Sequence, residues 1–223
     1  MSFKIGDSVV VKQGVKEPDS EGFEIGVWQG RIIEIDKLSN AENIVICIEW
    51  DSITLNQLPS NYIHKSEIDG LDWQIMNLYD TDIDKTVSRD NPNDVTRVQD
   101  LLTDKYCWSS IGDEGLRISE VLEGLKPDDD MACYDRWFEF LSSKLSFPLN
   151  SIITDSSDSW LIKTGDRIQI KSLSNIADLY GIIAKIKFNG KSYDYPLCDI
   201  RAIDIKSSDY QLINDYRVWF ANR

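Results

Sequence analysis

The sequence has little of the chemistry on which most enzymes depend, beginning with a single histidine among 223 residues. His64 follows an expected strand, where a lone histidine is more often a surface or core residue than a general base. The chain contains no G-x-S-x-G nucleophile elbow, no P-loop and no G-x-G-x-x-G motif. Glu49 and Asp51 flank Trp50 and could suit acid–base chemistry, although a solvent-facing strand edge explains them more simply. We therefore expect a protein that is not an enzyme.

Cysteine is also scarce, and long apolar runs are missing. Cys47, Cys107, Cys133 and Cys198 lie far apart without a C-x-x-C pair. This spacing excludes common zinc sites and indicates reduced, buried thiols. The N-terminal residues lack the apolar core of a signal peptide, and no apolar stretch approaches the roughly 18 residues of a membrane span. We expect a soluble, cytoplasmic protein that does not enter a membrane.

Basic residues are outnumbered, because 24 lysines and arginines stand against 38 aspartates and glutamates, for a formal net charge of -14. Proteins that bind a phosphate backbone concentrate lysine and arginine, so this balance argues against a nucleic-acid partner. An excess of carboxylates suits a divalent cation or a basic protein partner, and it also suits solubility alone.

Two stretches of the sequence share one pattern of short strands. "FKIGDSVVVKQG" leads through "IGVWQGRIIEID" to "NIVICIEW", and "IKTGDRIQIKSL" leads through "DLYGIIAKIKFNG" to "KSYDYPLCDI". Each begins with Gly-Asp and an alternating strand, and Asn189-Gly190 is typical of a tight hairpin turn. The pattern predicts an α+β fold in which two small SH3-like β-barrels flank a short helical region. Two unrelated β-meanders would give a similar pattern.

The expected barrels cover about residues 1–85 and 150–206. Between them the polar stretch "SRDNPND" is the best boundary. The expected domains are therefore an N-terminal barrel at 1–87, and a helical segment plus C-terminal barrel at 88–223.

In the middle of the chain the hydrophobic period changes from two to 3.6, which is typical of helices. The first helix is expected to be capped by Asn93 or Asp94. The apolar stripes of the three expected helices are Val95, Val98 and Leu102, then Ile118, Val121, Leu122 and Leu125, then Tyr134, Phe138, Leu141 and Leu145. At the C-terminus, "YRVWF" has aromatic residues at helical spacing and predicts a further helix that packs on the body.

The third helix, expected over about 127–145, carries an acidic run at its start. Pro127 suits the first helical position, because its missing N–H has no partner there. Asp128, Asp129 and Asp130 then occupy the first turn, beside the positive end of the helix dipole. This stabilising role explains the run without a ligand.

Two further acids lie on the flank opposite the apolar stripe. Asp135 and Glu139 are one helical turn apart and could share one cation with a loop from elsewhere. Asp128 is on the same flank but too far along the axis to join them directly, at about 1.5 Å per residue. Calcium takes about six to eight oxygen ligands, so spacing alone favours a polar helix face over a metal site.

The stretch "LYDTDIDKTVSRDN" is a second acidic candidate, and it fails as an EF-hand. Asp80, Asp82 and Asp84 match the first three acidic positions of the calcium loop. Lys85 stands where the sharp turn needs glycine, and Asn91 stands where the bidentate glutamate belongs. A solvated exit from the first barrel is the simpler interpretation.

Two other groups of residues admit a binding role. Asp155 and Asp158 lie in the polar loop "ITDSSDSW" and could supply additional oxygen ligands. Trp28 and Trp50, with Tyr62, could line a barrel groove for peptides or modified lysines. Tryptophans that fill the core of a small barrel are the more common case.

The C-terminal half resembles a known family. "WFEFLSSKLSFPLNSII", followed by "TGDRIQIKSL", "DLYGIIAKI" and "YPLCDI", is similar to the small CcbP-like calcium-binding proteins of heterocyst-forming cyanobacteria. The resemblance covers about residues 112–205, and Leu149 departs from the second Phe of the family's "FPF" turn. It implies calcium binding in an arrangement other than an EF-hand, and the carboxylates that it points to are those of Asp128, Asp129, Asp130, Asp135 and Glu139.

The sequence therefore predicts a non-catalytic calcium-binding protein, a buffer or a calcium-responsive binder, with calcium as its cofactor and the barrels as a rigid frame. The alternative is an acidic protein–protein interaction module that neutralises a basic partner, as bacterial immunity proteins do. The two differ in geometry. A calcium site needs carboxylates that converge on one point, whereas a neutralising surface needs them spread over a face.

Overall fold

The chain forms two compact units, Met1–Tyr106 and Cys107–Arg223. The computed structural model describes residues 2–18, 22–36, 44–156 and 161–223. The units divide after Tyr106, whereas the sequence analysis placed the boundary between residues 87 and 88. The difference arises because the helix that begins within the polar "SRDNPND" stretch contributes its apolar face to the core of the first unit.

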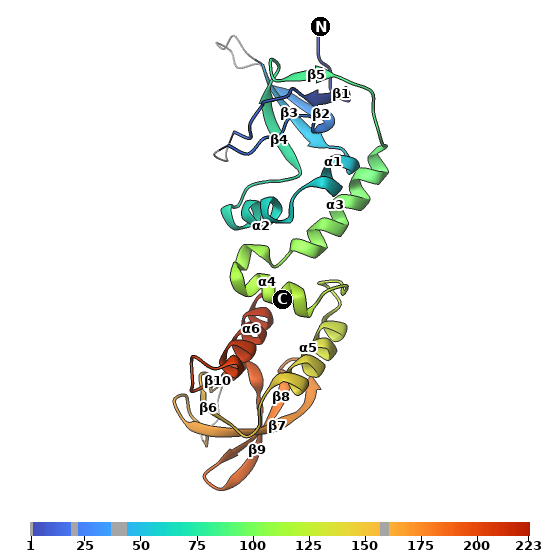
Figure 1. Ribbon diagram of the computed structural model, residues 1–223. Helices are drawn as coiled ribbons and strands as arrows, with labels where there is room; N and C mark the ends of the chain where they lie inside the picture. Colours follow the sequence, from blue (N-terminus) through green and yellow to red (C-terminus); the bar gives the residue numbers. More distant parts are fainter. Residues whose placement is uncertain (1, 19–21, 37–43, 157–160) are drawn as a thin grey trace. The chain divides into compact units, whose positions relative to one another are not determined.

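The first unit contains a five-stranded antiparallel sheet in the order β4-β3-β2-β1-β5 (Figure 1). Its strands are β1 (Ser8–Val11), β2 (Gln29–Asp36), β3 (Val45–Trp50), β4 (Ile75–Tyr79) and β5 (Ile83–Lys85). The register of β2 on β3 shifts between Ile32 and Glu34, and such bulges bend a strand. Gly30 lies opposite Trp50, where an added Cβ would collide with the carbonyl of Glu49. Only glycine allows this close approach of the two backbones.

Alternation along the strands selects the side chains of the first core. Val9 and Val11 are buried, whereas Ser8 and Val10, which alternate with them along β1, are partly exposed. Trp50, at the end of the interior strand β3, is fully buried. Removing such apolar surface from water supplies most of the free energy that stabilises a sheet of this size.

Three helices complete the first unit, namely α1 (Ser52–Gln57), α2 (Ser60–Asp69) and α3 (Pro92–Tyr106). All three contribute buried apolar residues to the core that the sheet forms. In α3 the predicted stripe is confirmed, because Val95 and Val98 are buried and Leu102 packs against them. The apolar stripe of α3 therefore packs against the core that the preceding strands and helices of the first unit form.

The start of α3 lies earlier than the sequence analysis predicted. The side chain of Asn91 accepts a hydrogen bond from the N–H of Asp94 at 3.2 Å, and the Asp94 carboxylate accepts one from the N–H of Asn91 at 3.4 Å. This reciprocal arrangement is a capping box. Asn91 therefore caps the helix in place of Asn93 or Asp94, and Pro92 takes the first helical position, where proline is favoured.

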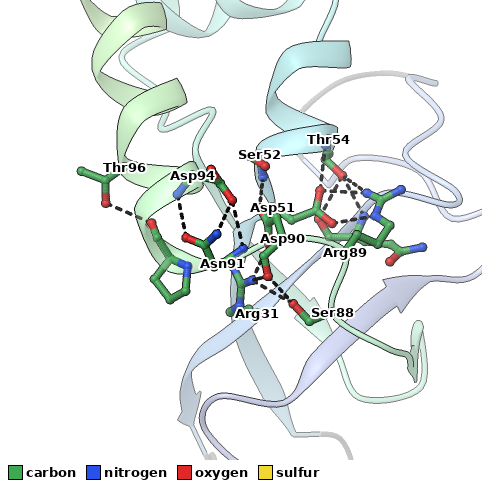
Figure 2. Close-up of polar contacts among 12 residues, drawn as sticks. Arg31, Asp51, Ser52, Thr54, Ser88, Arg89, Asp90, Asn91, Asp94 and Thr96 are labelled. Atoms are coloured by element: carbon green, nitrogen blue, oxygen red, sulfur yellow. Dashed lines mark hydrogen bonds and ion pairs between the residues drawn. The ribbon is translucent and has the colours of Figure 1, made fainter.

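The segment that connects β5 to α3 is bound to the first unit by two ion pairs (Figure 2). Arg89 donates from Nε and Nη2 to the two carboxylate oxygens of Asp51, each at 2.8 Å. Asp90 pairs with Arg31 and also accepts a hydrogen bond from the N–H of Ser52 at 2.6 Å. The stretch that was expected to separate two domains is therefore an integral part of the first unit.

The second unit also contains a five-stranded antiparallel sheet, in the order β10-β6-β7-β8-β9. Its strands are β6 (Leu149–Ile153), β7 (Arg167–Ala177), β8 (Gly181–Phe188), β9 (Lys191–Pro196) and β10 (Ile200–Ala202). Its helices are α4 (Asp113–Val121), α5 (Asp130–Lys144) and α6 (Ser208–Asn222), with short 3-10 turns η1 (Ser109–Ile111) and η2 (Leu197–Asp199). The hairpin turn predicted at Asn189-Gly190 joins β8 to β9, and both residues have positive φ.

Helices α5 and α6 provide the aromatic part of the second core. Trp137 of α5 is fully buried, although the predicted stripe assigned that place to Phe138, which is only partly buried. Tyr216 of α6 accepts a hydrogen bond from the N–H of Ile182 at 2.8 Å. Its hydroxyl lies where a Cβ on Gly181 would be, so β8 begins with glycine. The predicted packing of the C-terminal helix on the body is confirmed.

The α+β class is confirmed, with one antiparallel sheet in each unit. Both sheets are open, since within the described residues no pairing joins β4 to β5 or β9 to β10. The SH3-like character of the two sheets therefore stays a prediction. In the described part of the chain, no helix is both long and apolar enough to cross a bilayer.

Candidate metal centre

The acidic run lies at the start of α5, and its three aspartates have different roles. Asp129 caps the helix, because its carboxylate accepts a hydrogen bond from the N–H of Ala132 at 3.1 Å. Asp130 is the first helical residue, and Asp128 precedes the cap. Pro127 thus lies outside the helix, which corrects the predicted start. An aspartate is a much stronger cap than the residue that would precede Pro127, and it moves the start of the helix to itself.

Asp130 has a cationic neighbour, Arg223, which lies 93 positions later in the sequence. The guanidinium of Arg223 lies 3.4 Å from its carboxylate. The same guanidinium lies over the rings of Phe220 and Tyr134, with its carbon 4.3 Å and 5.0 Å from the two centroids. Stacking on two rings restrains the arginine. A cation that binds Asp130 must therefore compete with Arg223.

Asp135 and Glu139 project from the exposed side of α5, one turn apart, as predicted from their spacing. The opposite side of the helix carries the buried residues Tyr134, Trp137 and Leu141. In the described part of the chain, no hydrogen bond or ion pair joins either carboxylate to a loop of the second unit, so the additional ligands that the sequence analysis invoked are not seen there. The two carboxylates are accessible to a cation in solution.

The carboxylates of α5 are the type of ligand that calcium prefers, but in the described structure they are not grouped around one point. All five predicted ligands, Asp128, Asp129, Asp130, Asp135 and Glu139, are exposed, and carboxylate oxygen is the donor that calcium prefers. Within the described ranges, however, no three His, Cys, Asp or Glu side chains are grouped so that they could hold a metal ion. A cation on α5 would complete its coordination with water and backbone oxygens.

A second group of acids, which the sequence analysis mostly missed, lies around Tyr195. The hydroxyl of Tyr195 donates to the carbonyl of Asp155 at 3.0 Å. Burial raises the pKa of Tyr195, and the charges of Asp199, Asp155 and Asp166 raise it further. Burial also raises the pKa of Asp199, and the neighbouring charge of Asp155 adds to the effect. Like charges in a half-buried place are stabilised by a cation. Asp155 and Asp166 lie near the two ends of the connection between β6 and β7, and Asp199 lies in η2. Their spacing in the sequence therefore gave no signal.

The remaining acidic candidate, the failed EF-hand, does not form a loop around an ion. Asp80 accepts a hydrogen bond from the N–H of Ile44 at 3.2 Å. Asp84 lies within the strand β5, 3.7 Å from the ammonium of Lys12. Asp80 and Asp82 lie in the short turn between β4 and β5, and Asp84 continues into the extended strand, whereas a calcium loop must curl around its ligand. Asp158, proposed from the sequence as a further oxygen donor, lies outside the described residues.

The residues considered for acid–base chemistry take structural places. Asp51 follows β3 and caps α1, where it accepts a hydrogen bond from the N–H of Thr54 at 2.7 Å. Glu49 accepts one from the side-chain amide of Gln99 at 3.2 Å. His64 lies within α2, and not after a strand as expected; its Nδ1 is buried without a hydrogen-bond partner. In the described structure, no hydrogen bond or ion pair joins these three residues to one another.

Known proteins resemble the second unit. The CcbP family, described as calcium binding, matches residues 124–220. No curated protein matches the chain. The crystal structure of CcbP from Anabaena is 21% identical, with a TM-score of 0.41, over 48% of this chain and 89% of that chain. A calcium-binding protein in its calcium-binding form is 18% identical, with a TM-score of 0.39, over 49% of this chain and 90% of that chain. The family match confirms the predicted resemblance of the C-terminal region to CcbP.

Proposed function

We propose that the CcbP-like region of this protein binds calcium and that the protein acts without catalysis, as a calcium buffer or a calcium-responsive binding protein. The family match over residues 124–220 carries this proposal. The net charge of -14 favours the accumulation of cations near the surface. The exposed carboxylates at the start of α5 lie within the matched region and supply hard oxygen donors.

Within this proposal, Asp128, Asp129, Asp130, Asp135 and Glu139 are the ligands, in an arrangement other than an EF-hand. The three aspartates are consecutive, so the start of α5 concentrates three negative charges within the length of one helical turn. Arg223 opposes a cation at Asp130, from which it lies 3.4 Å away. The acids around Tyr195 are the alternative location within the same region. Like the acids of α5, these described residues do not form a group of three that could hold a metal ion, but a cation there would relieve the repulsion between Asp155 and Asp199.

Calorimetric titration of the chelator-stripped full chain with calcium, at physiological salt and with magnesium as a control, tests the proposal. We expect a saturable calcium signal in the range of about 10⁻⁶ to 10⁻³ M. Two combined variants locate the site: Asp128→Asn/Asp129→Asn/Asp130→Asn, and Asp135→Asn/Glu139→Gln. Asparagine at residue 129 still caps the helix, so the first variant removes charge without removing the cap.

A matched control comes from α3, which lies outside the matched region. Asp100 and Asp104 are exposed and one turn apart, so Asp100→Asn/Asp104→Asn removes the same charge as the Asp135/Glu139 variant. This control should leave calcium affinity nearly unchanged. Loss of binding in Asp155→Asn/Asp199→Asn, with both α5 variants unaffected, would move the site to the acids around Tyr195. A flat trace for the unmodified chain would refute calcium binding altogether.

The alternative function, neutralisation of a basic protein partner, has only the net charge of -14 in its support. It makes a distinct prediction, because a neutralising surface would lose affinity for its partner gradually as acids are removed from any exposed face. We place it second because the family match supports calcium binding and offers no support for a basic partner.

A further inference from the structure

A short antiparallel pair in the first unit brings a glutamate opposite a phenylalanine. Lys16 and Glu24 form an isolated antiparallel bridge. One residue further along, the N–H of Glu17 donates to the carbonyl of Phe23 at 2.9 Å. Residues that lie opposite each other in an antiparallel pair project their side chains from the same face. Glu17 and Phe23 therefore share a face of this pair.

Burial shows that this shared face is the inner one. Ile25 is fully buried, Phe23 packs against the first core, and Glu17 is only 5% exposed. On the outer face, Lys16 and Glu24 are exposed. The alternation of the pair therefore assigns Glu17 to a place that otherwise takes an apolar side chain. Exceptions of this kind are expected at functional positions, since they cost stability.

The carboxylate of Glu17 is buried, and its Oε2 atom has no hydrogen-bond partner. A buried polar atom without a partner destabilises the folded state, and a buried charge does so more strongly. In the described part of the chain no three acidic, histidine or cysteine side chains form a group that could hold a metal ion, so a divalent cation lacks further ligands here. An unpaired carboxylate oxygen instead calls for a single hydrogen-bond donor that carries positive charge.

Aromatic rings surround the same end of the core. Phe23 stacks on Tyr62 with ring centroids 4.9 Å apart and planes inclined by 13°. Trp28 meets Phe23 edge to face at 5.8 Å and Tyr62 at 5.6 Å. Phe23 and Trp28 are both partly exposed, so part of each ring is accessible to an approaching group. The faces of aromatic rings attract cations, and tryptophan does so most strongly.

We propose that Glu17, Phe23 and Trp28 form a site for the ammonium group of a lysine side chain from a protein partner. Glu17 accepts one hydrogen bond at Oε2, and the two rings contact the methylenes and the positive charge. Oε2 is a single buried acceptor and suits the compact ammonium of lysine, whereas an arginine fork usually contacts both carboxylate oxygens. The ammonium must keep at least one N–H, so lysine and its monomethyl and dimethyl forms fit, and the trimethyl form does not. Methylation that leaves one N–H weakens hydration and favours binding between rings.

Titration of the full chain with lysine analogues tests this site. The protein carries ¹⁵N-labelled tryptophan, and Trp28→Phe identifies the indole signal of Trp28. The probes are N-acetyl-lysine methylamide and its monomethyl, dimethyl and trimethyl forms, with a calcium chelator present. We expect a saturable shift of the Trp28 signal with the first three probes. Glu17→Gln should weaken the binding about tenfold or more, because it removes the charge from the hydrogen bond.

Two further variants keep the result interpretable. Glu24→Gln makes the same chemical change on the outer face of the same pair and should not alter the affinity. Phe23→Leu keeps an apolar side chain but removes one ring, and it should weaken binding even if Glu17→Gln disturbs the fold. The proposal is overturned if no probe shifts the Trp28 signal at tens of millimolar, or if Glu24→Gln weakens binding as much as Glu17→Gln. It is also overturned if the trimethyl form binds best, or if Phe23→Leu binds as well as the unmodified chain.

Discussion

Arg89 forms a bidentate ion pair with Asp51, a residue that lies 38 positions earlier in the chain, and both hydrogen bonds measure 2.8 Å. Asp51 is only 4% exposed, and it also caps α1 through the N–H of Thr54. The carboxylate of Asp51 thus follows the end of β3, caps α1 and holds the connection to α3. The start of α3 is therefore positioned by the first sheet.

Removal of this arginine should destabilise the first unit. Arg89→Ala leaves the buried carboxylate of Asp51 without its cation, and we expect a loss of about 2–3 kcal/mol in the free energy of unfolding. Urea unfolding followed by tryptophan fluorescence measures this loss. Arg97→Ala is the matched control, because Arg97 pairs with Asp94 at an exposed place, and it should cost less than about 0.5 kcal/mol. Equal effects of the two variants would show that the Arg89 pair is as weak as a surface pair.

The carboxyl group of Asp90, which follows Arg89 in the sequence, should make the stability of the first unit sensitive to acid. Burial alone would raise the pKa of Asp90, but hydrogen bonds from Ser52 and the ion pair with Arg31 outweigh burial and hold its pKa below the ordinary value. A carboxyl whose pKa is lowered by folding stabilises the protein above its unfolded pKa of about 4. That contribution disappears as the pH falls through the lower, folded pKa.

The change that isolates this effect is Asp90→Asn. The variant should be less stable than the unmodified chain at pH 7, and the difference should shrink progressively below about pH 4. Urea unfolding at a series of pH values measures both curves. A difference that stays constant down to about pH 2 would mean that the ionisation of Asp90 does not contribute.

For Asp199 in the second unit we expect the opposite effect of ionisation on stability. Burial and the charge of Asp155 raise its pKa, so the ionised form destabilises the folded state at neutral pH. Asp199→Asn should therefore increase stability at pH 7 in the presence of a chelator, and the gain should vanish as the pH falls below the unfolded pKa of about 4. Thermal unfolding at pH 7 and at low pH measures the gain. A variant that is less stable at pH 7 would contradict the predicted repulsion.

Loss of the Tyr216 hydroxyl should lower the free energy of unfolding even when the aromatic ring is kept. Tyr216→Phe leaves the N–H of Ile182 buried without an acceptor, which we expect to cost about 1–3 kcal/mol. Tyr180→Phe, at an exposed place on the neighbouring turn, should leave the free energy of unfolding almost unchanged. Amide hydrogen exchange at Ile182 gives a direct reading, because its protection should fall in Tyr216→Phe and not in Tyr180→Phe.

Much of the local structure followed from the sequence by itself. The alternation around Val9 and Val11 predicted a strand, and the spacing of Val95 and Val98 predicted an amphipathic helix. Asn189-Gly190 predicted a hairpin turn, which joins β8 and β9. These features depend on neighbours within a few residues along the chain, where period and propensity act directly. The resemblance to CcbP was likewise carried by contiguous residues.

Only the tertiary structure decided which distant side chains meet. The pair of Arg89 with Asp51, the place of Asp199 beside Asp155, and the inward face of Glu17 each depend on contacts that no local pattern contains. The division between the two units differs from the predicted boundary for the same reason. The polar stretch 88–94 resembles a linker in sequence, but Arg89 and Asp90 form ion pairs with buried or partly buried side chains of the first unit. Ion pairs and like-charge contacts arise when separate loops are brought to one place, so long-range packing determines them.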